Sequence, residues 1–156
     1  MTASIPKAVA ESAGRSVLCW LATVDNSGQP NVSPKEAFSV YDENHLVIAN
    51  VASPHSVRNV TLNAKVCVSF VDIFVQKGFK LTGTANNIPK EHREFSQWAA
   101  PLQQLTQGRF PIQSVIVVKV LVAEPIVAPS YWLFPTEVTE QSQVEAAMGT
   151  YGVQPL

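Results

Sequence analysis

The sequence predicts a mainly β protein, a small β-barrel with helices at its periphery. Short apolar stretches recur along the chain, and turn-forming clusters such as DNSG at 25–28 and DEN at 42–44 separate them. Apolar residues make up 46% of the 156 residues and charged residues only 15%. Strands this apolar in so short a chain are expected to close into a small barrel, which also removes exposed edges. The length suits a single domain over 1–156.

The first third of the chain is expected to contain one helix and four strands. Ser4 is placed to cap the helix, Pro6 suits its first turn and Gly14 suits its end. The stretch SVLCWLATV is typical of a buried strand. We expect the helix over residues 4–14 and the strands over 16–24, 30–33, 37–41 and 45–50.

A second helix signal follows the fourth strand. Ser53 is a cap residue and Pro54 a first-turn proline, so a helix is expected from Pro54 to Leu62. The stretch PKEHREFSQWAAPLQQL carries apolar residues at helical spacing in a polar context, which predicts a surface helix over 89–105. We expect further strands over 65–72, 78–85 and 113–127 and a last helix over 139–150, which makes six to seven mostly antiparallel strands.

Charge and composition exclude some classes of function. The net charge of −1 and the pI near 6.3 do not fit a nucleic-acid or membrane-surface binder, since either needs a basic excess. The low charged fraction indicates apolar surface buried against a partner, so a homo-oligomer is expected. Cys19 and Cys67 lie in apolar stretches without CxxC spacing and are interpreted as reduced core residues. With no signal or spanning segment, we expect a cytoplasmic protein.

Catalytic and metal-binding motifs do not stand out in the sequence. It has no G-x-S-x-G elbow, no G-x-x-x-x-G-K-[ST] loop and no G-x-G-x-x-G fingerprint. His45, His55 and His92 lack ligand spacing with one another, with a cysteine or with a carboxylate pair, so no metal site is expected. No pair of Asp or Glu is marked out for acid–base work, and we assign no catalytic residue.

Two polar clusters are suited to binding an anion. In an extended chain Asn31, Ser33 and Lys35 share one face. Ser56, Arg58 and Asn59 lie in the first turns of the expected helix, where free N–H groups and the helix dipole favour phosphate. Taken alone, each cluster is better explained by solvated side chains or a helix cap. Both together in one small barrel favour a phosphate ligand.

A family resemblance rests on three stretches of the sequence. LATVDNSGQPNVSPK, LVIANVASPHSVRNVTLNAKVCVSF and GFKLTGTA resemble the pyridoxamine 5′-phosphate oxidase-like flavoproteins, and the tail beginning YWLFPTEVTEQSQ looks like that of short bacterial members. The resemblance implies a split β-barrel of the FMN-binding type. It also implies a homodimer with one FMN in each of two sites at the interface.

The resemblance also assigns roles to residues of this chain. Asn31, Val32, Ser33, Pro34 and Lys35 are expected along the flavin ring edge and ribityl chain, with Lys35 reaching toward the phosphate. Ala49 and Asn50 are expected to border the ring. The phosphate and ribityl end are expected to be held by Ser56, Val57, Arg58 and Asn59.

The chain departs from the vitamin B6 oxidases at its C-terminal end. Those enzymes end in an arginine-bearing segment that grips the substrate phosphate, whereas this chain has no Arg, Lys or His after Ser130. B6 oxidation is therefore not expected. Tyr131 and Trp132 fit either a dimer seam or a cover over the partner's flavin.

Three functions remain open at this point. The first is an FMN-dependent oxidoreductase for a small molecule, with NAD(P)H as one candidate electron donor. The second is a non-enzymatic flavin carrier or redox sensor. The third keeps the fold and places a deazaflavin or haem in the cleft, haem needing one of the three histidines as its ligand.

Overall fold

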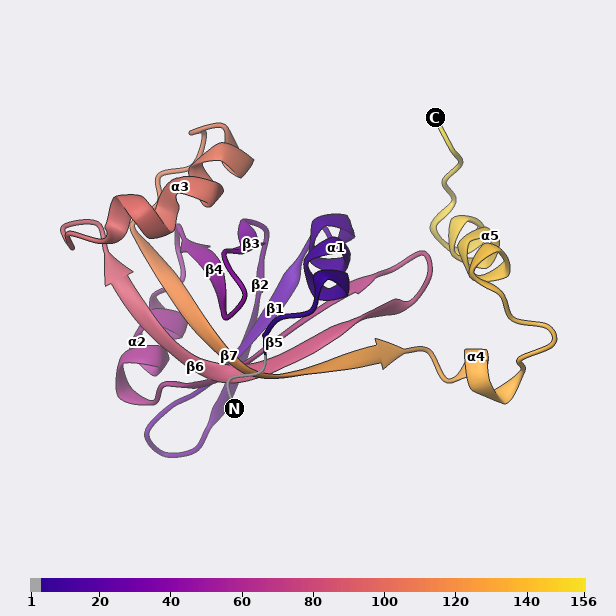
Figure 1. Cartoon of the computed structure of the whole chain (residues 1–156), viewed down its shortest axis with the longest axis horizontal. Coiled ribbons are helices and arrows are strands. Elements are labelled where there is room, and N and C mark those ends of the chain that lie inside the picture. The colour runs from indigo at the N-terminus through magenta and orange to yellow at the C-terminus, as the bar shows by residue number, and fades with distance from the viewer. Residues whose placement is uncertain (1–3) are drawn as a thin grey trace.

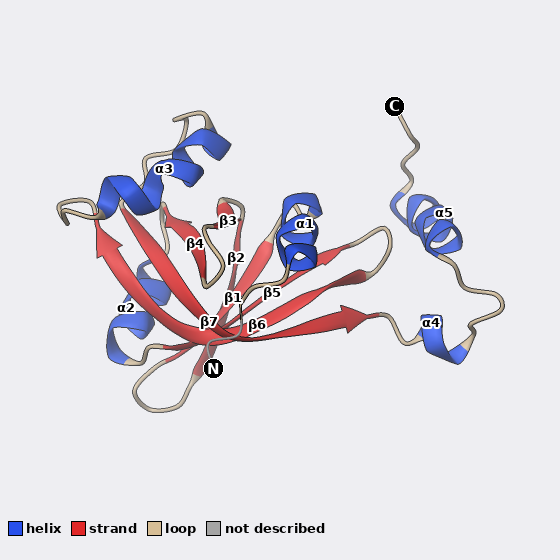
Figure 2. Cartoon of the chain, in the orientation of Figure 1, coloured by secondary structure: helices blue, strands red, loops and turns tan. Residues whose placement is uncertain are grey.

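The computed structural model describes residues 4–156 (Figure 1). One sheet contains seven strands in the order β2-β1-β5-β6-β7-β4-β3, and all neighbouring pairs are antiparallel. The sheet curls into a half-barrel with helices at its periphery (Figure 2), so the expected mainly β, split-barrel architecture is confirmed. The strands are β1 (Cys19–Val24), β2 (Pro30–Lys35), β3 (Phe38–Val40), β4 (His45–Asn50), β5 (Lys65–Asp72), β6 (Lys77–Pro89) and β7 (Ser114–Val127). The helices are α1 (Lys7–Arg15), α2 (Pro54–Leu62), α3 (Phe95–Thr106), α4 (Ser130–Leu133) and α5 (Glu140–Tyr151).

Strand β6 is longer than the sequence pattern predicts. It continues past Ala85 to Pro89, because the polar residues Asn86 and Asn87 pair with β7. Helix α3 accordingly begins at Phe95 rather than at residue 89. Pairing with a long neighbouring strand outweighs the weak strand propensity of this segment. The short helix α4 was not expected from the sequence.

The helix starts differ from the sequence expectation in their capping. Helix α1 begins at Lys7 with Pro6 in the N-cap position and no side-chain cap, so the expected cap by Ser4 is wrong. Ser53 does occupy the N-cap position of α2 ahead of Pro54, yet its hydroxyl accepts no hydrogen bond from the helix. That hydroxyl is engaged in the candidate site instead.

Two apolar clusters fill the fold. The larger lies inside the half-barrel, where Leu21, Val68 and Leu81 are fully buried beneath α1. The smaller packs α3 against β4 and β7, with Ala99 and Val115 at its centre. Strand β7 contributes to both clusters and therefore joins the two parts of the core.

The two cysteines lie in different environments. Cys19 belongs to the larger cluster, and burial raises the pKa of its thiol to about 12 although the positive charge of Lys35 acts in the opposite direction. Cys67 is half-buried and outside both clusters, so the expectation of a second core cysteine is wrong. The reason is the two-residue repeat of β5, which turns Val66 and Val68 inward and Cys67 outward.

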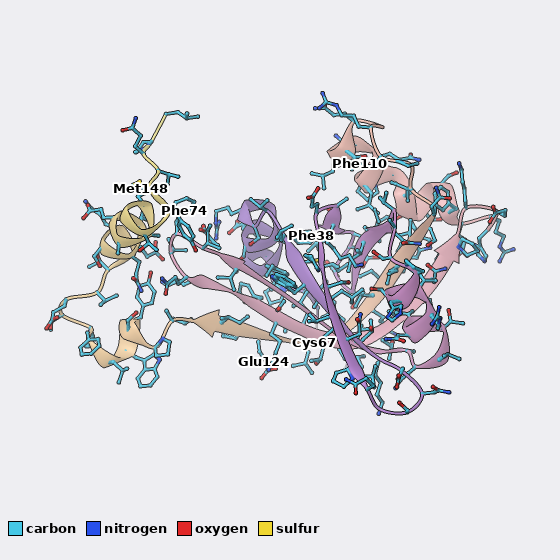
Figure 3. The ribbon with its side chains drawn as sticks, turned by 180° about the vertical axis from the view of Figure 1, so that it is seen from behind. Phe38, Cys67, Phe74, Phe110, Glu124 and Met148 are labelled. Carbon is cyan, nitrogen blue, oxygen red and sulfur yellow. The ribbon has the colours of Figure 1, made fainter. Side chains whose placement is uncertain are left out.

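Strands β2, β1, β5, β6 and β7 share a face turned away from the larger cluster, which we call the outer face. Trp20, Val32 and Val122 are 45%, 59% and 48% exposed on it. Figure 3 shows Glu124 pointing away from the side of the sheet that α1 covers. Two rows of side chains cross the outer face: Val32, Ala22, Cys67, Thr82 and Val122 in one, and Pro34, Trp20, Ser69, Lys80 and Glu124 in the other.

Residues 128–156, which we call the C-terminal arm, extend beyond the half-barrel. Strand β7 pairs with β4 only as far as Lys119 and then continues beside β6, so that α4 and α5 lie away from the barrel (Figure 1). The arm is anchored on the hairpin between β5 and β6. The Tyr131 hydroxyl donates a 2.7 Å hydrogen bond to the Val75 carbonyl, and Lys77 Nζ lies 2.8 Å from Glu140 Oε1. Within residues 4–156, every helix is too short or too polar to cross a bilayer.

Candidate cofactor site

Strand β2 directs three polar side chains toward α2. Asn31 and Ser33 are half-buried and Lys35 is only 5% exposed, whereas the intervening residues are exposed. The shared face predicted from the alternating sequence is therefore confirmed. Helix α2 packs against β1 and β2 on this side of the sheet, which closes the space around the three side chains.

The ammonium group of Lys35 lies among serine hydroxyls. Its Nζ donates hydrogen bonds to Ser53 Oγ at 2.5 Å and to Ser56 Oγ at 3.2 Å. The Ser56 hydroxyl lies 3.0 Å from Ser33 Oγ and thereby links the two polar clusters of the sequence. Among residues 4–156 no carboxylate forms an ion pair with Lys35.

Burial lowers the pKa of Lys35 from its ordinary value of 10.5, because a charged amine loses hydration inside the protein. The nearby Cys19 acts weakly in the opposite direction. An anion placed against Lys35 would reverse this shift and relieve the cost of burying a lone charge. The cluster is therefore prepared for a negatively charged ligand.

Asn50 holds the start of α2 beside the sheet. Its side-chain carbonyl accepts a 2.9 Å hydrogen bond from the Ser53 backbone N–H, and its amide donates a 2.8 Å bond to Ser114 Oγ. Strand β4, helix α2 and strand β7 meet at this one side chain. The first backbone N–H groups of α2, which have no partners within the helix, thus lie next to Lys35.

A cavity of about 370 Å³, which we call the first cavity, opens beside this cluster. Lys35, Ser53 and Glu36 form its polar part, and its volume is within the usual range for a small-molecule site. Its mostly apolar remaining walls come from Leu18, Pro34, Ala37, Ala49, Val51, Ala52 and Phe110. Phe110 lies in the loop between α3 and β7 (Figure 3).

Several of the expected site residues lie outside the first cavity. Arg58 is exposed and lines a second cavity of about 320 Å³ together with Asn31, Asn59 and His55. The buried Asn59 amide donates a 3.0 Å hydrogen bond to Thr23 Oγ1. Two further residues of the expected set, Val57 and Val32, lie against the larger core cluster and on the outer face, respectively. The expected residues thus divide between the two cavities, the core and the outer face.

Ser53 is a site residue that the sequence reasoning assigned only to helix capping. The signal was present, since a serine before a first-turn proline lies at the helix start where an anion would bind. Phe110 had no comparable signal, because it comes to the first cavity from the loop between α3 and β7, 57 residues after Ser53. The part of the chain from residue 4 to 156 shows no group of three or more His, Cys, Asp or Glu able to hold a metal ion.

Residues 5–125 match the family described as pyridoxamine 5′-phosphate oxidase. The chain belongs to this family. No curated protein matches it. The family match ends three residues before the C-terminal arm begins.

Solved structures share the same fold. HupZ from Group A Streptococcus is 23% identical with a TM-score of 0.65, covering 76% of this chain and 91% of that one. An FMN-binding protein from Syntrophomonas wolfei is 15% identical with a TM-score of 0.64, covering 78% of this chain and 88% of that one. An F420 reductase is 19% identical with a TM-score of 0.60, covering 77% of this chain and 98% of that one. At these identities the likeness concerns the fold alone.

Proposed function

We propose that this protein is an FMN-binding oxidoreductase for a small molecule and acts as a homodimer. The observation that carries the proposal is the buried Lys35 ammonium group, which within residues 4–156 has hydroxyl partners and no carboxylate partner. Family membership and the FMN-binding relative support the choice of a flavin.

The donor set of the first cavity suits a phosphate monoester. Such a group carries about −1.5 to −2 charges at neutral pH and accepts several hydrogen bonds. Lys35 supplies the positive charge, Ser53 supplies a hydroxyl at the cavity wall with the buried Ser56 behind it, and the start of α2 supplies backbone N–H groups. Ala49, Val51 and the other apolar walls suit an aromatic ring system. FMN would supply hydride or electron transfer, while these residues bind and orient it.

Titrations with FMN and riboflavin test the phosphate site. A charge-assisted bond from Lys35 is worth roughly 1.5–3 kcal/mol, so Lys35→Ala should weaken FMN binding about ten- to a hundred-fold. Riboflavin has no phosphate, and its affinity should hardly change. Fluorescence quenching measures both ligands, and Lys90→Ala, at an exposed lysine beyond β6, is the matched control.

The same titration with Arg58→Ala distinguishes the two cavities. Arg58 was expected to share the phosphate with Ser56, but the structure has it lining the second cavity. A loss of FMN affinity with Lys35→Ala that exceeds the loss with Arg58→Ala supports the first cavity. A loss with Arg58→Ala alone would move the phosphate to the second cavity, and no loss with either variant would contradict both sites.

Spectra and reduction assays test the remaining parts of the proposal. An oxidised flavin spectrum of the purified protein separates FMN from haem and from a deazaflavin. Reduction of the bound flavin by NAD(P)H with multiple turnovers to an acceptor supports an oxidoreductase. A flavin that binds but does not turn over with donors and acceptors of this kind favours the carrier function.

Pyridoxamine and pyridoxine 5′-phosphate are not expected to be substrates. Their phosphate needs a cationic partner, and the chain has no Arg, Lys or His after Ser130. We expect oxygen uptake with either compound well below about 1 per second, the lower end of common turnover numbers. A rate at or above that value would show that a cation from another segment replaces the missing arginine.

A further inference from the structure

The C-terminal arm carries a run of large apolar side chains that its own chain leaves uncovered. Trp132, Leu133 and Phe134 are 66%, 54% and 51% exposed. They are consecutive in and directly after α4, so three large exposed apolar side chains are concentrated in one short segment of the arm. Surfaces rich in exposed aromatic residues of this kind are typical of protein–protein contacts.

The arm contacts its own chain at the tip of the β5–β6 hairpin. There the Tyr151 ring lies 6.3 Å from the Phe74 ring, and Tyr131 and Glu140 bond to Val75 and Lys77. These contacts fix where the arm begins and how α5 sits. In the described part of the chain they leave the apolar run of α4 exposed, although the arm follows directly on a strand of the central sheet.

The charge of the arm is one-sided. All eleven Lys and Arg residues of the chain lie at or before Lys119, whereas the arm carries Glu137 and Glu145, besides Glu140, which is paired with Lys77 of its own chain. The outer face has the opposite character. Lys65 and Lys119 lie on it, and so does Lys80, whose ammonium group is paired with Glu124 at 2.9 Å.

The outer face is complementary to the arm in polarity as well as in charge. It exposes Trp20, Val32 and Val122 among its lysines, whereas the arm exposes aromatic residues among glutamates. Figure 1 shows β7 carrying the arm away from its own half-barrel, so the arm does not cover its own outer face. A second copy of the chain offers the same face to be covered.

We infer that the arm of each protomer packs across the outer face of a second copy of this chain. The arrangement is reciprocal, as in a two-fold dimer, so that two arms clasp the pair of half-barrels. This inference rests on the homodimer of the proposed function. It adds which segment holds the dimer together, and that segment lies outside the family match.

A double substitution in the arm tests the clasp. Trp132→Ser with Phe134→Ser removes two exposed apolar side chains from each arm, and we expect the dimer dissociation constant to rise at least about a hundred-fold. Sedimentation equilibrium measures it, and thermal unfolding checks that the fold is intact. The matched control is Leu105→Ser, at a leucine that is 56% exposed on α3 and off the outer face.

Charge reversal tests the face on which the arm lies. Lys65→Glu with Lys119→Glu should weaken the dimer about ten-fold or more, and Glu137→Lys with Glu145→Lys added in the same chain should restore it in part. Lys90→Glu is the control. Rescue supports contact between arm and outer face, because a repulsive outer face alone would not be corrected by changes in the arm.

Three outcomes would overturn the inference. One is a dimer dissociation constant of the Trp132→Ser, Phe134→Ser variant equal to that of the wild-type protein. Another is a dimer that is weakened by the lysine substitutions and is not restored when the glutamate substitutions are added. The third is a monomeric wild-type protein, which would also remove the homodimer from the proposed function. FMN titration of the same samples shows separately whether the flavin site survives.

Discussion

At the scale of single residues, the buried charge on Lys35 lowers the stability of the flavin-free protein. A buried ammonium group surrounded by hydroxyls keeps only part of the hydration it has in the unfolded chain. Function and stability therefore make opposite demands at this position. The site favours the charge once a phosphate is bound and disfavours it otherwise.

Lys35→Met should stabilise the flavin-free protein and impair FMN binding. Methionine has a similar volume and no charge to bury, so we expect the free energy of unfolding to rise by about 1 kcal/mol or more. FMN affinity should fall as it does with Lys35→Ala. Urea unfolding of the flavin-free proteins measures the first effect. A destabilised Lys35→Met protein would mean that the three serines depend on the ammonium group for their arrangement.

The pH dependence of the same variant gives an independent check. Burial lowers the pKa of Lys35 below 10.5 in the folded state, so the unfolded state binds more protons between the lowered pKa and 10.5. The contribution of Lys35 to stability therefore increases as pH rises through that window. FMN affinity should decrease over the same window as the amine loses its charge. Lys35→Met should show neither change.

The sequence predicts some of these residues better than others. The alternation of β2 is a local property, so it correctly placed Asn31, Ser33 and Lys35 on one face. The side of α2 on which Ser56 and Arg58 lie depends on how the helix docks on β1 and β2. That docking results from tertiary packing, and it buries Ser56 while it leaves Arg58 exposed.

At the scale of elements, the register of β6 and β7 depends on a bulge between Thr82 and Gly83. A Cβ atom on Gly83 would lie 2.0 Å from the Lys119 carbonyl oxygen, closer than any side chain tolerates. The bulge turns both strands at the point where β7 leaves β4. Glycine is therefore required here for space rather than for an unusual backbone angle.

Gly83→Ala should destabilise the protein by about 2 kcal/mol or more, because backbone must move to admit the methyl group. Gly149→Ala is the matched control. Gly149 lies within α5 with open space around its Cα, so alanine there should raise the free energy of unfolding by roughly 0.5–1 kcal/mol. Thermal or urea unfolding measures both. A neutral Gly83→Ala would show that the two strands can separate at the bulge without loss.

The predicted strands and helices agree with the structure where local signals decide them. The Ser53–Pro54 pair correctly predicted the start of α2, and turn clusters correctly separated β1 from β2 and β3 from β4. The end of β6 could not be predicted, since Asn86 to Pro89 are extended only because β7 pairs with them. Helix α4 is a single turn with too few residues to give a periodic signal.

At the scale of the whole molecule, the two cysteines differ in what covers them. Cys19 is fully buried with a raised pKa, so alkylating reagents should not modify it until the protein unfolds. Cys67 lies in the middle of the outer face, and the clasped dimer should shield it. Modification of Cys19 thus measures unfolding, and modification of Cys67 measures dissociation of the proposed dimer.

We expect Cys67 to be alkylated faster in the Trp132→Ser, Phe134→Ser variant than in the wild-type protein at equal concentration. Diluting the wild-type protein below its dimer dissociation constant should raise the rate in the same way. Mass spectrometry after iodoacetamide treatment measures modification at each cysteine. Equal rates for Cys67 in the two proteins would place the arm away from this part of the outer face.

Because β3 is an edge strand, β3 and β4 join the rest of the described sheet through β7 alone, so folding of this part of the chain depends on a distant segment. Asn50 and Ser114, which are paired in the register, are separated by 64 residues, and closing a loop of that length costs about 4 kcal/mol of chain entropy. The hairpin of β3 and β4 must therefore wait for β7, whereas β1, β2 and β5 can pair early. During synthesis the apolar edge of β4 remains open until residue 119 has been made. Mutations that slow β7 pairing should consequently appear first as aggregation of the nascent chain rather than as a lower melting temperature.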